Sequence, residues 1–360
     1  MAEFNLIQTA AELQQAVNIL SKKPLLAIDL ECENNLHHYG AYVSLLQISD
    51  GNDVWIIDAL KIKDVTPILN LLTSKEIQKA FHDVNFDLRI IYNQWHCLAA
   101  NIFDTQLAAI FTGEEKLGLG FLLEKYFNIK TEKKFQRVDW TRRPLSKEQL
   151  QYAAQDVANL LQLKKVLDNN LIKQERLSWV IEECQNLETM DWSYNEQTYL
   201  DIPGAKSLGA MQRSVLQALF TARKVLAQKA DRPPFMVFSN KQLLAFSKQP
   251  PDNWATVKGV HPLVAESSNY LKQLVLAAKQ KLKLTEKTAK RKLTPRQYQW
   301  TKDLLELRTK MGQQLGLKGH LIINNSQAWD IAATQSLDCL RNWQKELIKN
   351  QPLVLQILRS

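Results

Sequence analysis

The chain has 360 residues, of which 45% are hydrophobic and 23% charged, a balance typical of globular proteins and unlike that of disordered chains. This length predicts two or three domains, because single cores rarely grow so large. No run approaches the roughly 20 apolar residues that a membrane helix needs. The N-terminus also lacks the basic segment and apolar run of a signal peptide, so we expect a cytoplasmic protein with no membrane partner.

Charge is divided unevenly along the chain. Residues 1–190 hold 20 Lys and Arg against 25 Asp and Glu, which gives −5, and residues 191–360 hold the remaining 26 and 12, which gives +14. A basic half of this kind favours a polyanionic partner such as nucleic acid, although a solvated basic surface has the same composition. The cysteines form no CxxC pair, so the sequence indicates neither a zinc site nor a disulfide framework.

Strands and helices alternate in the first half. The predicted strands cover 24–32, 43–49, 53–58, 77–82 and 101–105, and the predicted helices cover 64–72, 85–95, 105–112, 117–127 and 146–169. Asp50-Gly51-Asn52 is a tight-turn sequence, so the first three strands should form an antiparallel meander. Ser146 and Gln149 form a capping-box pattern at the start of the last helix. The element order is that of an RNase H-like α/β domain, with a mixed sheet flanked by helices.

The second half reads as entirely helical. We predict an α/β domain over residues 1–190, a linker over 191–209, and two helical domains over 210–290 and 291–360. Periodic apolar positions predict amphipathic helices at 211–230 and 265–282. The lysines and arginines of the segment 279–296 either contact nucleic acid or form a solvated connection; the densest of them are Lys279, Lys281, Lys283, Lys287, Lys290, Arg291 and Lys292.

Two carboxylates lie near the end of the first predicted strand, within the stretch LLAIDLECE (25–33). Side chains alternate across a strand, so Asp29 and Glu31 should point to one face. Two such groups repel each other unless a cation lies between them. Oxygen ligands of this kind favour Mg²⁺ or Mn²⁺ over zinc. Taken alone, however, an Asp-x-Glu pair also fits an ordinary strand end.

Three further residues carry candidate chemistry. Asp87 lies in the first turn of a predicted helix that follows a strand, where it could also compensate the helix dipole. Tyr152 and Asp156 are four residues apart in the predicted helix 146–169 and therefore share one face. A phenol and a carboxylate one turn apart could hold a water molecule and a metal ion together.

The chain order of these residues is more specific than any part of it. Asp-x-Glu on a first strand, Asp on a later helix and Tyr-x-x-x-Asp on a last helix resemble the Tyr-containing branch of the DEDD exonuclease superfamily. SLLQIS (44–49), IFDTQ (102–106), DWTRRPLS (139–146) and LQYAAQDVANLLQL (150–163) look like the ribonuclease D family, over about residues 20–190. Residues 211–282 resemble an HRDC domain, a helical nucleic-acid-binding module, and residues 296–332 resemble a second, weaker copy.

The resemblance implies a two-metal 3′→5′ exoribonuclease that releases nucleoside 5′-monophosphates. It implies that Asp29, Glu31 and Asp156 bind one Mg²⁺ or Mn²⁺ ion, that Asp29 bridges to a second ion supported by Asp87, and that Tyr152 orients the attacking water. Its substrates would be the 3′ ends of structured RNA, with tRNA precursors as the family expectation. A DNA 3′→5′ exonuclease with the same active site is the alternative, single-stranded DNA being its substrate. A non-catalytic RNA-binding protein is disfavoured, because all four carboxylates and the tyrosine are present.

Other residues near these motifs have two open interpretations each. His82 either reaches the active site or is a satisfied loop histidine. Arg142 and Arg143 either contact substrate phosphates or form a solvated basic turn. Gln47 and Asp104 are either structural or substrate-lining.

The loop after the first strand departs from the family pattern. Many relatives carry an arginine-containing run with paired aromatics there, whereas this chain has NNLHHYG (34–40), which puts substrate contacts by the loop in doubt. Adjacent histidines in a loop are usually solvated, so a metal role for His37 and His38 is disfavoured. Glu33 has the parity of Asp29, and we expect it beyond the strand end, in solvent or near the last nucleotide of the substrate.

Overall fold

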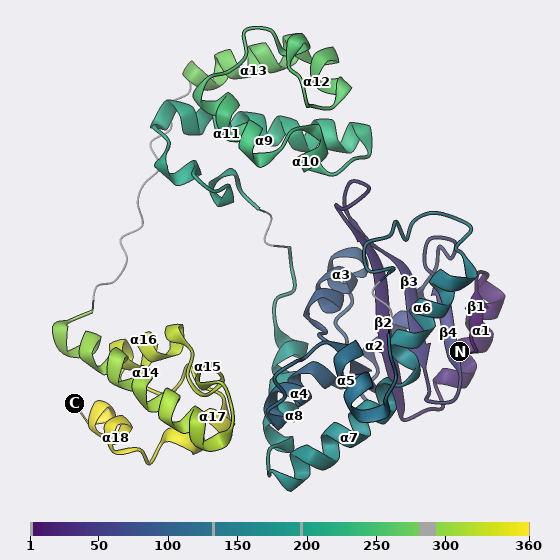
Figure 1. Ribbon diagram of the computed structural model, residues 1–360, viewed down its shortest axis with the longest axis vertical. Coiled ribbons are helices and arrows are strands. Elements are labelled where there is room, and N and C mark those ends of the chain that lie inside the picture. The colour runs from purple at the N-terminus through teal and green to yellow at the C-terminus, as the bar shows by residue number, and fades with distance from the viewer. Residues whose placement is uncertain (1–2, 132–133, 195–196, 281–292, 360) are drawn as a thin grey trace.

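A six-stranded sheet with flanking helices is followed by two helical groups (Figure 1). The computed structural model describes residues 3–131, 134–194, 197–280 and 293–359. The strands are β1 (Asn5–Ile7), β2 (Leu25–Asn34), β3 (Ala41–Ser49), β4 (Val54–Asp58), β5 (Gln78–Phe81) and β6 (Ile102–Asp104), and their order across the sheet is β1-β4-β3-β2-β5-β6.

The sheet is mixed, as predicted. Strands β2, β3 and β4 form the expected antiparallel meander, while β5 and β6 continue from β2 in parallel. Strand β1 adds a parallel edge beside β4 and was not predicted, nor was the helix α1 that follows it. The capping box of α1, formed by Thr9 and Glu12, was a readable signal in the sequence.

Eight helices accompany the sheet in the described residues. They are α1 (Ala10–Leu20), α2 (Thr66–Thr73), α3 (Asn85–Trp95), α4 (Thr105–Thr112), α5 (Leu119–Phe127), α6 (Lys147–Ala158), α7 (Leu160–Lys173) and α8 (Leu177–Thr189). The capping box of Ser146 and Gln149 is present at the start of α6. The single predicted helix 146–169 is wrong, because the backbone of Asn159 leaves helical geometry and separates α6 from α7.

The sheet divides two apolar cores. Ile28 and Leu30 pack with α1, α2 and α3 on one face, whereas Ala27, which has the opposite parity, packs with α6 and α7 on the other. Alternation along β2 therefore places Asp29 and Glu31 on the face that α6 covers.

The first helical group, residues 197–280, packs around Trp254, which is fully buried. Its elements are two 3-10 turns (Tyr199–Asp201 and Ala205–Ser207), α9 (Ala210–Ala230), α10 (Pro234–Val237), α11 (Asn240–Lys248), a 3-10 turn at Trp254–Thr256, α12 (Pro262–Glu266) and α13 (Ser268–Gln280). Ile202, Ala205 and Leu208 belong to this core, so the end of the segment interpreted as a linker packs with the helices.

The second helical group, residues 293–359, contains α14 (Pro295–Leu315), α15 (Gly319–Ile322), α16 (Asn325–Thr334), α17 (Asn342–Ile348) and α18 (Pro352–Leu358). The described residues after the sheet domain thus form helices and no strands, as predicted. All but Lys279 of the densest basic cluster lie outside the described residues. No helix in the described ranges is both long and apolar enough to cross a membrane.

The second helical group is fixed to the sheet domain by tryptophan. Trp343 of α17 stacks on Trp179 of α8 with ring centroids 4.9 Å apart and meets Phe111 of α4 edge-on at 5.3 Å. The N-terminal amides of α17 donate to Glu182, from Asn342 at 2.7 Å and from Trp343 at 3.0 Å. Trp343 therefore belongs to the core on the α6 side of the sheet.

Candidate active site

Three carboxylates converge on the face of the sheet that α6 covers. Asp29 and Glu31 come from β2 and Asp156 comes from α6, and each offers an oxygen atom such that all three atoms lie within 4.8 Å of one another. The shared parity predicted for Asp29 and Glu31 is confirmed. The sheet supplies two of the carboxylates and the helix packed over it supplies the third.

Asp87 and Tyr152 complete this group. Asp87 lies in the first turn of α3, as predicted, and is 6% exposed; burial and then the charge of the nearby Asp29 raise its pKa. The Tyr152 hydroxyl donates a hydrogen bond to the Asp156 carboxylate one turn further along α6. All five residues singled out in the sequence are thus brought together by β2, α3 and α6.

The carboxylates of this site are costly to ionise without a cation. Burial raises the pKa of Asp29 to about 7. Burial and then the charges of Asp29 and Asp156 hold the pKa of Glu31 well above its usual range, and burial followed by the charge of Asp29 does the same for Asp156. A divalent cation would offset both effects, since it attracts the ionised form of every ligand. The all-oxygen donor set fits Mg²⁺ or Mn²⁺.

His82 and Asp104 make their hydrogen bonds within the fold. The two ring nitrogens of His82 contact the Thr105 hydroxyl at 2.9 Å and the Leu117 carbonyl at 2.8 Å. Burial lowers the pKa of His82 to about 4, so the ring is neutral and satisfied. Asp104 caps α4 by accepting from the Gln106 amide at 2.7 Å and also accepts from the Asp83 amide at 3.0 Å. These contacts favour the non-catalytic interpretation of both residues.

The two arginines differ. The Arg143 guanidinium donates to both carboxylate oxygens of Asp58, at 2.7 and 2.8 Å, and to carbonyls of Trp140 and Ser44. All its nitrogen atoms are occupied, so the structure corrects the phosphate-contact interpretation of Arg143: this side chain ties the segment before α6 to β3 and β4. Arg142 is 82% exposed in its side chain and lies 3.2 Å from Asp139, which leaves phosphate contact open as a prediction.

Glu33 corrects another expectation. It lies within β2 and is 2% exposed, so it is neither past the strand end nor in solvent. One carboxylate oxygen of Glu33 accepts from the amides of Leu36, at 2.5 Å, and His37, at 3.0 Å. Atoms of Glu33, His37 and Asp139 lie within 4.8 Å of one another, a spacing that would allow metal ligation. The existing contacts of Glu33 already account for its burial, because they fold the loop back onto the end of β2.

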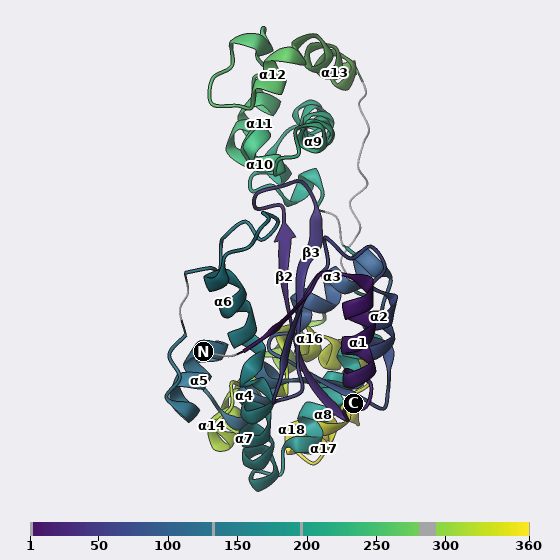
Figure 2. The ribbon, with the colours of Figure 1, turned by 90° about the vertical axis from the view of Figure 1, so that its right-hand side faces the viewer.

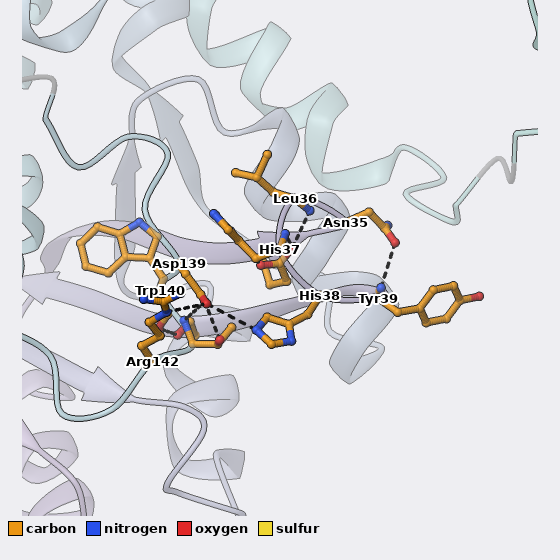
Figure 3. Close-up of polar contacts among 12 residues, drawn as sticks. Asn35, Leu36, His37, His38, Tyr39, Asp139, Trp140 and Arg142 are labelled. Atoms are coloured by element: carbon orange, nitrogen blue, oxygen red, sulfur yellow. Dashed lines mark hydrogen bonds and ion pairs between the residues drawn. The ribbon is translucent and has the colours of Figure 1, made fainter. Parts of the chain in front are cut away.

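The loop between β2 and β3 reaches the first helical group, and Figure 2 shows these two strands extending toward α9 and α10. His38 Nδ1 lies 2.6 Å from Asp231, which ends α9, and the amide of Tyr39 donates to the same carboxylate at 3.2 Å. The other ring nitrogen of His38 is 3.4 Å from Asp139, on which Arg142 also converges (Figure 3). The hydrogen bond with Asp231 raises the pKa of His38. His38 therefore links the sheet domain, through Asp139, to the end of α9 in the first helical group, through Asp231.

Comparison with known proteins agrees with this geometry. Residues 4–172 match the family model described as 3′-5′ exonuclease, and residues 212–270 match the HRDC domain. Ribonuclease D of Pseudomonas paraeruginosa is 30% identical over 77% of this chain and 75% of its own length. The chain belongs to the ribonuclease D family. Ribonuclease D of Haemophilus influenzae is 31% identical over 69% of this chain, and the match spans 64% of that protein.

The fold of a ribonuclease D is also found among solved structures. The crystal structure of Escherichia coli RNase D superposes with a TM-score of 0.74 over 99% of both chains, at 23% identity. This likeness confirms the predicted fold, an RNase H-like exonuclease domain followed by helices. The chain is accordingly a hydrolase of the ribonuclease D type, a 3′→5′ exoribonuclease, as the motif order indicated. The exonuclease family that it matches uses divalent metal ions.

Proposed function

We propose that this protein removes nucleoside 5′-monophosphates from RNA 3′ ends by two-metal hydrolysis at the group formed by Asp29, Glu31, Asp87, Tyr152 and Asp156. The observation that carries the proposal is the convergence of three carboxylate oxygens within 4.8 Å on one face of the sheet. Asp29, Glu31 and Asp156 would hold one Mg²⁺ or Mn²⁺ ion, and Asp29 and Asp87 would hold the second. Bound there, divalent ions would acidify a water molecule and offset the charge that develops on the phosphate.

Tyr152 acts through its hydroxyl group rather than through a phenolate. Burial, followed by the charge of Asp156, raises the pKa of Tyr152, so the hydroxyl remains protonated at neutral pH. Its hydrogen is donated to Asp156, which leaves the oxygen free to accept a hydrogen bond from a water molecule. In this arrangement Tyr152 orients the attacking water, and Asp156 fixes the direction of the phenol.

The proposed substrates are 3′ ends of structured RNA, tRNA precursors among them. The E. coli relative is described as an exoribonuclease involved in structured RNA processing. A net charge of +14 in residues 191–360 supports a phosphate-binding role for the helical half. The match over residues 212–270 supports assigning residues 210–290 to an HRDC domain, and the resemblance of residues 296–332 supports assigning residues 291–360 to a second HRDC-like domain. DNA remains the second candidate, and digestion of matched RNA and DNA oligomers would distinguish the two.

Digestion of 5′-labelled RNA with Mg²⁺ or Mn²⁺ tests the proposal directly. A ladder that shortens from the 3′ end and stops with EDTA is expected. Asp29→Asn should abolish activity because it removes a shared ligand, whereas Asp53→Asn, an exposed carboxylate in the same domain, should not. Full activity of Asp29→Asn would overturn the mechanism. Tyr152→Phe should keep metal binding and slow single-turnover cleavage; unchanged cleavage would remove Tyr152 from its role.

A further inference from the structure

The side-chain amide of Gln47, in β3, is fully buried and unpaired. It is 0% exposed, and neither its Oε1 nor its Nε2 atom has a hydrogen-bond partner among the described residues. Buried polar groups are nearly always paired, and an unpaired one costs stability. A side chain that is retained in this state needs an explanation beyond packing.

The register of the sheet places Gln47 beside the active site. Gln47 of β3 is directly opposite Asp29 of β2, and Ile56 of β4 is its neighbour on the other side. Side chains of directly opposed residues share a face, with Cβ atoms typically ~4.5–5.5 Å apart. The residues around it on this face, Ala27, Leu45 and Ile56, belong to the apolar core under α6. Asp29 is therefore the polar residue directly opposite Gln47; Glu31 and Asp58 lie diagonal to it on the same face, and Asp58 is already bonded to Arg143.

We propose that Gln47 is a positioning residue, whose Nε2 donates a hydrogen bond to the Asp29 carboxylate once Asp29 binds metal. The proposal rests on the two-metal function above and deepens it. Carboxylate ligands are usually held by hydrogen bonds from a second layer of residues, which fix the orientation of the ligand oxygens. An amide suits this place, because it donates without adding a positive charge that would compete with the cations.

The apolar variant Gln47→Met separates this role from space filling. Methionine has a similar length and removes the unpaired amide. The melting temperature of Gln47→Met in EDTA should be equal to or higher than that of the natural protein, whereas its Mn²⁺ dissociation constant should rise by roughly 10- to 100-fold. Mn²⁺ binding is measured on the metal-free protein by calorimetry or electron paramagnetic resonance, without substrate. At saturating Mn²⁺, the kcat should largely recover, since the ligands themselves are unchanged.

Gln94 supplies a matched control. This glutamine of α3 is partly exposed and accepts a hydrogen bond from the Val43 amide of β3 at 2.7 Å. Gln94→Met should lower the melting temperature in EDTA and leave Mn²⁺ affinity unchanged, which is the reverse of the pattern expected for Gln47→Met. Gln47→Leu repeats the test with a different apolar shape, in case methionine packs poorly.

The Mn²⁺ and melting measurements test the two-metal function and the role of Gln47 separately. If the natural protein binds no Mn²⁺, the two-metal function fails. If the natural protein binds Mn²⁺ and both Gln47 variants bind it equally well, only the role of Gln47 is overturned. A lower melting temperature in EDTA for both Gln47 variants, or failure of both to fold, would assign Gln47 to packing and likewise overturn the proposal.

Discussion

The two helical groups are attached to the sheet domain by opposite kinds of contact. The second group inserts Trp343, 5% exposed, into a core of the sheet domain. The first group is joined mainly through the Asp231 carboxylate, 62% exposed in its side chain, and the His38 ring, 25% exposed, with Tyr39 packed at the edge of its core. Exposed charged pairs contribute little stability, whereas aromatic burial contributes much. We infer that the second group moves with the sheet domain, while the first group can separate from it at low cost.

Trp343→Ala should have the largest effect. It removes the stack on Trp179 and the edge contact with Phe111, and truncation of a buried aromatic costs about 3–5 kcal/mol. Thermal unfolding and small-angle scattering should show a less stable, more extended molecule. Tyr298→Ala, which truncates a 58% exposed aromatic of the same helical group, is the control. Equal stability of the two variants would contradict the inferred attachment.

Glu182→Ala should have the next largest effect on the same attachment. Its carboxylate satisfies the first amides of α17, and loss of such a helix cap typically costs about 0.5–2 kcal/mol. The free energy of unfolding in urea gives the measurement. Glu346→Ala, which removes a carboxylate paired with Lys349 on the surface, should change little in comparison. A larger loss of unfolding free energy for Glu346→Ala than for Glu182→Ala would contradict the role of Glu182 in this attachment.

Breaking the contact between His38 and Asp231, which joins the first helical group to the sheet domain, should have a smaller effect on stability. In a double-mutant cycle, His38→Ala and Asp231→Ala should show a coupling of about 0.2–1 kcal/mol, as partly exposed pairs do. The quantity measured is the closed fraction, meaning the fraction of molecules in which the first helical group contacts the sheet domain. Energy transfer between dyes on these two parts reports it. The matched pair Lys63→Ala and Asp231→Ala, in which Lys63 is an exposed residue of the sheet domain, should be additive. Coupling comparable to the effect of Trp343→Ala would remove the distinction between the two attachments.

The pH dependence of the first contact should be the smallest effect. Because Asp231 raises the pKa of His38, the contact is fully stabilised below the ordinary histidine pKa of about 6.5 and weakens as pH rises through the raised value. Asp231 has a lowered pKa and Asp139 a pKa of about 2, so both stay ionised over this window. The closed fraction should therefore fall between mildly acidic and alkaline pH. His38→Gln should remove this dependence, and persistence of the dependence would point to another group.

The sequence was sufficient for residues whose role depends on local geometry. Asp29 and Glu31 share a face because of strand alternation, and Tyr152 and Asp156 share one because of the helical repeat; both relations hold in the structure. The surroundings of Gln47 and Glu33 could not be predicted from the sequence, because they depend on the register between β2 and β3. That register shifts between Glu31 and Cys32. The contact between His38 and Asp231 joins residues 193 positions apart, and no local pattern encodes it.

The pairing of β2 has a consequence for amide hydrogen exchange. Strand β2 pairs with β5 only from Leu25 to Ala27, while its pairing with β3 continues to Asn34. From Asp29 onward it therefore has a strand partner on one side only. Amides of Leu26 and Ala27 should exchange slowly, and those that follow on the side away from β3 should exchange faster. Deuterium uptake along one strand would then mark the point at which β5 ends and the metal ligands begin.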